Sequence, residues 1–177
     1  MYNKISIIGG SGTGKTTLSN ILSKKYNIQA IHIDGIHHLK DWKTRDKSER
    51  DKIILDILQK EQWIIDGTYK DTLKQRLQKS DLIIWLDYST TSQLKGILKR
   101  FLKNFMKERE EIPGCKERLN LKFLKYVINY NKNKRHFITD ALQTIDENKI
   151  KVIIFKKQKD LNKWLKEQNI DIRKELD

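Results

Sequence analysis

The sequence predicts an α/β protein in which one parallel sheet of five strands is covered by helices on both faces. Short apolar segments alternate along the chain with longer amphipathic segments, which is the pattern of parallel strands joined by helical crossovers. A glycine-rich motif follows the first apolar segment directly, and three of these segments end in aspartate. Since 177 residues are typical of one domain, we expect residues 1–177 to form a single domain.

The first strand and the first helix are predicted at residues 4–8 and 16–26. The segment K-I-S-I-I is β-branched and bounded by glycine, whereas Leu18, Ile21 and Leu22 recur at helical spacing. The same two patterns predict the later elements. In order, these are a strand at 30–34, a helix at 47–60, a strand at 63–67, a short helix at 69–78, strands at 81–87 and 150–155, and a closing helix around 161–165.

A long segment, residues 88–149, separates the last two strands and has a mostly helical pattern. Apolar residues share one broad face over residues 90–106 and again over residues 119–130. The junction between these two helices is polar and is broken by Pro-Gly. We therefore expect residues 107–118 to form a mobile lid between two packed helices.

The motif after the first strand, G-x-x-x-x-G-K-[ST], predicts the binding of a nucleoside triphosphate. Its glycines let backbone N–H groups turn inward at the positive end of the following helix, where a polyphosphate is held. Lys15 can reach the β- and γ-phosphates, the Thr16 hydroxyl is an oxygen ligand suited to Mg²⁺, and Thr17 can contact the α-phosphate. The predicted nucleotide-binding residues are Gly9, Gly10, Ser11, Gly12, Thr13, Gly14, Lys15, Thr16 and Thr17.

Three aspartates follow predicted strands, at positions Asp34, Asp66 and Asp87. In open parallel sheets, ligands bind beyond the carboxyl ends of the strands. The three acids are therefore expected at the edge where a Mg-nucleotide must lie. Any one of them could equally be a turn or cap residue, but three strand exits of this kind favour a site.

The chain is strongly basic, with a formal net charge of +14. Lysines are spread over most surface segments, whereas residues 95–135 hold 13 basic and 4 acidic residues, a local net charge of +9. Such a region can cover a bound triphosphate or bind a nucleic-acid backbone. Both partners remain open on the sequence alone.

Cysteine content and hydropathy bear on the location of the protein. The single cysteine, Cys115, excludes an intrachain disulfide. No apolar run approaches the roughly 18 residues of a membrane-spanning helix, and the first strand begins without a preceding leader pattern. A cytoplasmic protein is expected.

The motifs together resemble the DNA topology modulation proteins of the FlaR type, small P-loop proteins related to adenylate kinase. The resemblance rests on G-G-S-G-T-G-K-T-T, I-D-G, W-I-I-D-G-T-Y, D-L-I-I-W-L-D and a basic helix-lid-helix containing P-G-C-K-E. It spans nearly the whole chain. It implies a three-layer α/β/α P-loop NTPase fold with strand order 2-3-1-4-5 and a helical lid, together with transfer of the γ-phosphoryl group of ATP.

The resemblance also implies roles for individual residues. Asp66 would hold waters on Mg²⁺ and Gly67 would admit the acceptor, while Thr68-Tyr69-Lys70 replaces the Phe-Pro-Arg of adenylate kinases. Arg100 and Arg109 resemble the arginines that border the phosphates and close on the transferring group. Lys156 lies where related folds contact adenine. Asp34 occupies the position that orients or deprotonates an acceptor hydroxyl, and the expected acceptor pocket comprises Asp34, His37, Trp42, Asp66, Gly67 and Tyr69.

Two functions follow from these patterns. The first is an ATP-dependent kinase for a small acceptor, with Lys15, Asp34, Arg100 and Arg109 as catalytic residues and Mg²⁺ as the metal. The alternative is a nucleic-acid-binding protein that ATP regulates. A motor-type ATPase is disfavoured because no apolar strand ends in an Asp-Glu pair, and a GTPase because no strand is followed by Asn-Lys-x-Asp.

Overall fold

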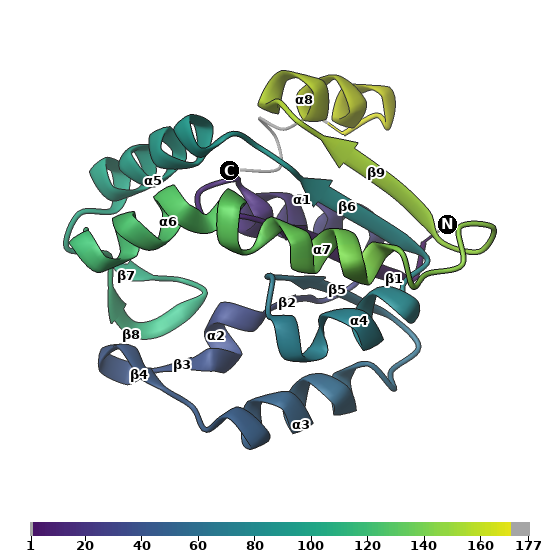
Figure 1. The fold of residues 1–177 in the computed structure, drawn as a ribbon, viewed down its shortest axis with the longest axis horizontal. Coiled ribbons are helices and arrows are strands. Elements are labelled where there is room, and N and C mark those ends of the chain that lie inside the picture. Colours follow the sequence, from purple (N-terminus) through teal and green to yellow (C-terminus); the bar gives the residue numbers. More distant parts are fainter. Residues whose placement is uncertain (1, 171–177) are drawn as a thin grey trace.

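A computed structural model of the protein describes residues 2–170 and shows a five-stranded parallel sheet (Figure 1). The strand order is β2-β5-β1-β6-β9, and all four neighbouring pairs are parallel. The predicted order 2-3-1-4-5 is therefore confirmed. The strands are β1 (Lys4–Gly9), β2 (Ala30–His32), β5 (Trp63–Asp66), β6 (Leu82–Leu86) and β9 (Lys151–Phe155).

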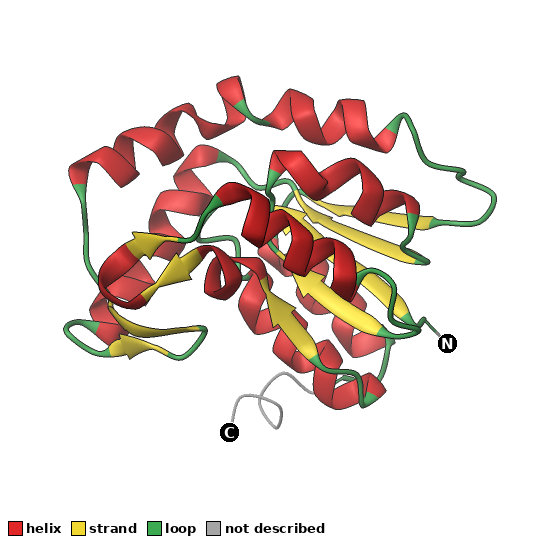
Figure 2. Ribbon diagram, turned by 90° about the horizontal axis from the view of Figure 1, so that it is seen from below, coloured by secondary structure: helices red, strands yellow, loops and turns green. Residues whose placement is uncertain are grey.

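Helices cover both faces of the sheet (Figure 2), which confirms the three-layer arrangement. Apolar side chains of α1 and α8 pack on one face, and those of α3, α4 and α7 pack on the other. Because both faces are covered, β1, β5 and β6 are buried along nearly their whole length. The main helices are α1 (Lys15–Tyr26), α3 (Lys47–Ile57), α4 (Lys70–Gln78), α5 (Thr90–Asn104), α6 (Leu121–Asn133), α7 (Arg135–Leu142) and α8 (Gln158–Glu167).

The connection after β2 differs from the expectation. The predicted strand at 30–34 ends at His32, and a short helix, α2 (Ile33–His37), follows at once. Asp34 therefore lies in the first turn of a helix and not on a strand. Residues 38–44 then form a small hairpin, in which β3 (His38–Leu39) and β4 (Lys43–Thr44) flank the 3₁₀ turn η1 (Lys40–Trp42).

The long segment before β9 contains a second hairpin in place of the polar junction expected there. After α5, β7 (Glu108–Arg109) pairs with β8 (Ile112–Lys116) in an antiparallel arrangement. Ile112 and Cys115 are fully buried, because this lid hairpin packs on the 38–44 hairpin. The Cys115 sulfur accepts the Trp42 backbone N–H at 3.2 Å and donates to the Leu39 carbonyl at 3.2 Å.

The remainder of the long segment is helical, but it divides at Lys134 into α6 and α7. The second of these helices was not predicted as a separate element. It packs Ile138 and Ala141 against the sheet and α4. Within residues 2–170, no helix combines the length and the apolar character that crossing a membrane requires.

Candidate functional site

The glycine-rich loop joins β1 to α1 at the carboxyl edge of the sheet. Gly12 and Gly14 have φ angles of +76° and +87°, which a side chain would disfavour. The Thr13 hydroxyl and the Lys15 ammonium both donate to the Gly10 carbonyl, at 2.9 and 2.7 Å. The loop thus folds over the amino end of α1, where free N–H groups and the helix dipole favour an anion.

Thr68 fastens the start of this loop to the end of β5. Its hydroxyl accepts the Gly9 N–H at 2.9 Å and donates to the Gly9 carbonyl at 3.0 Å. One hydroxyl can make both bonds because it is a donor and an acceptor at once. On the sequence, Thr68 stands out only as a difference from the Phe-Pro-Arg of adenylate kinases. In the structure, Thr68 positions the start of the phosphate loop.

Helix α5 lies directly against the loop. A Cβ atom on Gly96 would stand 2.0 Å from the Gly12 carbonyl oxygen, and one on Gly12 would stand 2.4 Å from the Gln93 carbonyl oxygen. Only glycines permit this approach. Because Arg100 follows Gly96 by four residues, it is carried on the same side of α5, one turn farther along.

The electrostatics of Lys15 show which groups lie near the loop. Burial lowers the pKa of Lys15, the Asp34 and Asp66 carboxylates oppose this effect, and Arg100 and Arg109 add to it. Two acids and two arginines from widely separated segments therefore lie close enough to act on the charge of Lys15. The structure brings together the sequence-predicted residues Lys15, Asp34, Asp66, Arg100 and Arg109.

Asp66 is buried at the carboxyl end of β5, and two side chains hold its Oδ2 atom. The Ser19 hydroxyl donates to it at 2.6 Å, and His32 Nδ1, across the strand pair, lies at 2.5 Å. Burial lowers the pKa of His32, but the hydrogen bond and charge of Asp66 outweigh burial and raise it above its usual value. Ser19 Oγ also lies 2.9 Å from the Thr16 carbonyl oxygen, so it links the acid to the start of α1.

Ser19 and His32 were missed as site residues. On the sequence, His32 alternates with isoleucines and reads as a strand residue. Only the parallel register, which sets His32 opposite Asp66, shows its role. For Ser19 the available signal was its spacing of three residues from Thr16 on the helix that follows the loop.

The residues present fit a magnesium ion bound together with a polyphosphate. The Thr16 hydroxyl and the Asp66 carboxylate are oxygen donors, and Ser19 bridges the two positions. Mg²⁺ keeps several waters and takes phosphate oxygens, so it needs only one or two protein oxygens. Within the described part of the chain, no cluster of three His, Cys, Asp or Glu residues forms a self-sufficient metal cage.

Arg100 on α5 and Arg109 in the lid meet one buried carboxylate, which the sequence did not reveal. Arg100 Nε lies 2.9 Å from Glu117 Oε2, and Arg109 Nε lies 3.9 Å from the same atom. Arg109 also donates from Nε to Glu111 at 3.1 Å. Burial raises the pKa of Glu111, but Arg109 outweighs this and holds it below its usual value. Within the basic region, Glu111 and Glu117 are therefore the residues that hold Arg100 and Arg109 in place.

The expected acceptor residues form a row of rings beside Asp34. Tyr69 donates its hydroxyl to Asp34 Oδ1 at 3.1 Å, and the ring centres of Tyr69 and His37 are 5.0 Å apart. His37 lies 4.6 Å from His38, and His38 lies 5.3 Å from Trp42. We call Tyr69, His37, His38 and Trp42 the aromatic row. It joins α2, the 38–44 hairpin and the residue before α4.

Gly67 directly follows Asp66 and begins the turn toward Tyr69. Its φ angle of +120° is one that side chains rarely adopt. Its carbonyl accepts a hydrogen bond from Arg76 at 2.6 Å, and its N–H donates to the Ile7 carbonyl at 3.2 Å. Both bonds hold the turn at the edge of the sheet, between β1 and the row.

Other predicted residues lie outside this group. Asp87 follows the carboxyl end of β6, and Arg135 binds both of its oxygens, at 3.0 and 2.9 Å, so this acid is already paired. Lys156 is exposed in the connection from β9 to α8, and Thr17 is exposed on α1. Their nucleotide contacts stay predictions.

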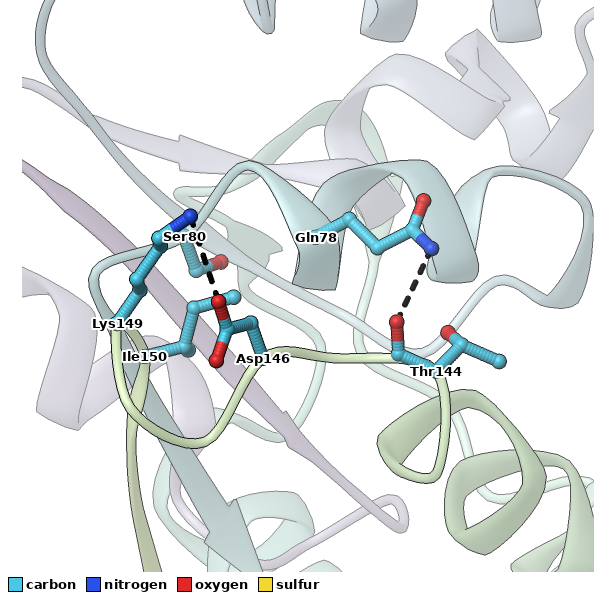
Figure 3. A pocket seen from close by; sticks show the side chains of 6 residues that line it. All are labelled: Gln78, Ser80, Thr144, Asp146, Lys149 and Ile150. Atoms are coloured by element: carbon cyan, nitrogen blue, oxygen red, sulfur yellow. Dashed lines mark hydrogen bonds and ion pairs between the residues drawn. The ribbon is translucent and has the colours of Figure 1, made fainter.

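A separate hollow of about 420 Å³ lies near the amino ends of β6 and β9 (Figure 3). Its polar side chains are engaged with their surroundings, because Gln78 donates to the Thr144 carbonyl at 3.2 Å and Lys149 pairs with Asp146 at 3.4 Å. It is at the opposite edge of the sheet from the phosphate loop. We therefore place the candidate site at the loop and not at this hollow.

The fold and the loop define a P-loop NTPase domain. The family model described as ABC transporter matches residues 2–174, and the chain belongs to that family. At the level of sequence, no curated protein matches the chain.

Among solved structures, the fold is shared with small kinases. Shikimate kinase from Acinetobacter baumannii, in complex with shikimate, has a TM-score of 0.60 at 12% identity, over 94% of this chain and 92% of that chain. Shikimate kinase from Bacteroides thetaiotaomicron has a TM-score of 0.57 at 15% identity, over 96% and 97%. Deoxyadenosine kinase from M. mycoides, with bound dATP, has a TM-score of 0.50 at 16% identity, over 94% and 99%. At these identities the similarity establishes the fold.

Proposed function

We propose that the protein is an ATP-dependent phosphotransferase that moves the γ-phosphoryl group of Mg-ATP to a small acceptor, a nucleoside, nucleotide or similar metabolite. The observation that carries the proposal is the convergence of Lys15, Arg100 and Arg109 with Asp34 and Asp66 at the phosphate loop. Phosphoryl transfer requires in-line positioning and neutralisation of oxygen charge, which this set supplies. The fold shared with small kinases supports the same class.

In the proposed reaction, the acceptor oxygen forms a bond to the γ-phosphorus while the bond from that phosphorus to the β,γ-bridging oxygen breaks, leaving ADP. The N–H groups of the loop and Lys15 bind the β- and γ-phosphates, and Arg100 and Arg109 neutralise the oxygens of the transferring group. Asp34 takes the proton of a hydroxyl acceptor, while Tyr69 fixes the orientation of its carboxylate. Thr16 and Asp66 would hold Mg²⁺, which supplies charge neutralisation at the phosphates.

The lid hairpin belongs to the same proposal. Residues 107–118 carry Arg109, and they reach the acceptor side through the contact of Cys115 with the 38–44 hairpin. Closure of such a segment excludes water and limits wasteful hydrolysis of ATP. We propose that the hairpin moves as a unit when nucleotide binds.

A transfer enzyme fits this chain better than a motor-type ATPase. The strand β6 is followed by Asp87 and Tyr88, where a pair of acids would be needed to activate water. Asp87 is bound by Arg135, and Tyr88 is buried. The resemblance to the DNA topology modulation proteins stays a prediction, as does the cytoplasmic location.

The alternative, a nucleic-acid-binding protein with ATP as regulator, is favoured by one surface feature. A shallow hollow of about 220 Å³ on α6 is lined by basic and tyrosine side chains. Its lining residues are Lys122, Lys125, Tyr126, Asn129, Tyr130, Asn133 and Lys134. Basic residues interleaved with aromatic ones can contact a phosphate backbone and bases.

The test is ADP release from ATP and Mg²⁺ across a panel of nucleosides, nucleotides and small alcohols. We expect release to rise with the correct acceptor and to be abolished by Lys15→Ala, while Lys25→Ala, an exposed lysine on the same helix, retains it. Circular dichroism of both variants confirms that the fold is intact. A flat response across the panel, together with salt-sensitive duplex binding, would overturn the proposal in favour of the alternative.

A further inference from the structure

Trp42 joins the 38–44 hairpin to the lid hairpin. Its backbone N–H donates to Cys115 Sγ at 3.2 Å, and its indole Nε1 donates to the Lys116 carbonyl at 3.1 Å. Both partners belong to β8. The backbone and the ring of Trp42 are therefore bound to the same strand of the lid.

Two arginines of the lid region lie against the Trp42 ring. Arg109 Cζ is 5.7 Å from the ring centre, and Arg118 Cζ is 5.0 Å from it. At this range an aromatic ring attracts a cation, and the attraction is stronger where water is excluded. The Arg109 side chain is only 9% exposed, and its Nε donates to Glu111 at 3.1 Å. The ring and this carboxylate together determine where the Arg109 guanidinium lies.

The backbone at Trp42 is held in a conformation that side chains disfavour. Asp41 and Trp42 have φ angles of +60° and +61°. A bulky residue keeps a positive φ only where surrounding contacts fix it. Those contacts come from the lid, through the two hydrogen bonds to β8 and through Gly114, where a Cβ atom would stand 2.7 Å from Lys40 Cγ. The turn therefore keeps its shape through the docked lid.

Trp42 is also one end of the aromatic row. The ring centre of His38 lies 5.3 Å away, and the row continues to Tyr69, which donates its hydroxyl to Asp34. The residue that contacts Arg109 is therefore continuous with the residues proposed to hold the acceptor. Trp42 is the point at which the row meets the lid.

We propose that Trp42 is a positioning residue, which places Arg109 for phosphoryl transfer only while the 38–44 hairpin is docked on the lid hairpin. The inference rests on the proposed function of Arg109. Because the same indole belongs to the aromatic row, an acceptor that packs on the row in its docked form stabilises the placement of the guanidinium. Placement of this arginine thus depends on the acceptor side, which limits transfer to water when no acceptor is bound.

Docking of the two hairpins is measured without any acceptor through Cys115, the single cysteine of the chain. Its thiol is buried beneath the docked hairpins, so it reacts with DTNB only when they separate. We expect Trp42→Leu, which keeps apolar bulk but lacks the indole N–H and the aromatic face, to raise the reaction rate about tenfold. The matched control is Trp164→Leu on α8, which packs in a different cluster. Equal rates in wild type and Trp42→Leu would overturn the docking role.

The action through Arg109 is measured by transfer from Mg-ATP at saturating acceptor. We expect Trp42→Leu to lower kcat about tenfold and to change the KM for ATP less than about twofold. Trp42→Phe retains a ring for the guanidinium and should recover part of this loss. In an Arg109→Ala background, Trp42→Leu should lower kcat by less than about twofold, because the partner it acts through is already absent.

The outcomes separate this inference from the proposed function. A further loss of about tenfold in the Arg109→Ala background, or an unchanged kcat in Trp42→Leu, overturns the positioning role and leaves the phosphotransferase standing. Transfer by the wild-type protein to no acceptor overturns the proposed function and, with it, the role of Arg109. The thiol rates still report in that case whether Trp42 docks the lid.

Discussion

Gly96 of α5 lies against the carbonyl oxygen of Gly12 in the phosphate loop, so closely that a Cβ atom there would stand 2.0 Å from that oxygen. This contact fixes the distance between the loop and the helix that carries Arg100. It explains how a basic helix far along the chain joins the first loop in one site. Each of the following predictions tests one such link.

Gly96→Ala should displace α5 from the loop. Alanine normally stabilises a helix relative to glycine by about 1 kcal/mol, but here the methyl group meets backbone that cannot move aside without disturbing the loop. We expect the free energy of unfolding to fall by about 1–3 kcal/mol. The Kd of a non-hydrolysable ATP analogue should rise roughly tenfold. Urea unfolding and calorimetry measure the two effects, with the exposed neighbour Lys95→Ala as control; equal stability of the two variants would contradict the contact.

Thr68→Val should loosen the start of the phosphate loop. Valine keeps the shape of threonine but leaves the Gly9 N–H and carbonyl without their bonds of 2.9 and 3.0 Å. We expect a loss of about 1–3 kcal/mol in the free energy of unfolding and weaker nucleotide binding. Thr72→Val is a matched control, because the Thr72 hydroxyl is buried without a hydrogen-bond partner in the described structure. Similar losses in both variants would show that the bonds to Gly9 are not the cause.

Glu117→Gln should disorganise Arg100 and Arg109. The carboxylate is 3% exposed and lies near Arg100 and Arg109, so its removal leaves their charges unbalanced. Because Arg100 keeps some contact with water, we expect a loss of about 2 kcal/mol in stability, less than the roughly 3–5 kcal/mol of fully buried pairs. The value of kcat should fall about tenfold, whereas the Kd of an ATP analogue should not rise. Glu110→Gln, an exposed acid in the same hairpin, is the control; an unchanged kcat in Glu117→Gln would remove this role.

His32→Gln should change how stability depends on pH. Because Asp66 raises the pKa of His32 above its usual value, protonated His32 stabilises the fold. This contribution is complete below about pH 6.5 and is lost as the pH rises through the raised pKa. We expect the free energy of unfolding of the wild type to exceed that of the variant, and we expect this difference to be about 1 kcal/mol larger at low pH than at high pH. Chemical unfolding without Mg²⁺ measures it. The control is the exposed His136→Gln, and a constant difference for His32→Gln would refute the linkage.

Most of the fold could be predicted because each main strand is a continuous apolar run. The segments at β1, β5, β6 and β9 were expected to within about one residue at each end. The two hairpins could not be predicted, because β3, β4 and β7 have only two residues each and β8 contains Pro-Gly, so neither hairpin shows an apolar run. Cys115 was expected in a polar loop, and it is buried only because the two hairpins pack on each other.

The site was predictable only in part. The loop residues follow from a local motif, and Asp34, Asp66, Arg100 and Arg109 were expected near it from the strand pattern and the resemblance. Glu117, His32 and Thr68 act through partners distant in the sequence, and no local pattern marks them. Ser19 was marked only by its spacing from Thr16. Asp87 follows the carboxyl end of β6, as expected, and the sequence did not reveal that Arg135 on α7 binds it.

The sequence by itself determined the phosphate loop, the alternation of strands and helices and the basic character of the lid region, because these depend on the chemistry of neighbouring residues. Tertiary structure alone decided which charges meet. It set Glu117 between the arginines, placed His32 opposite Asp66 and balanced Arg50 with two acids. The physical reason is that pairing of buried charges depends on distances across the fold, which the order of residues along the chain does not contain.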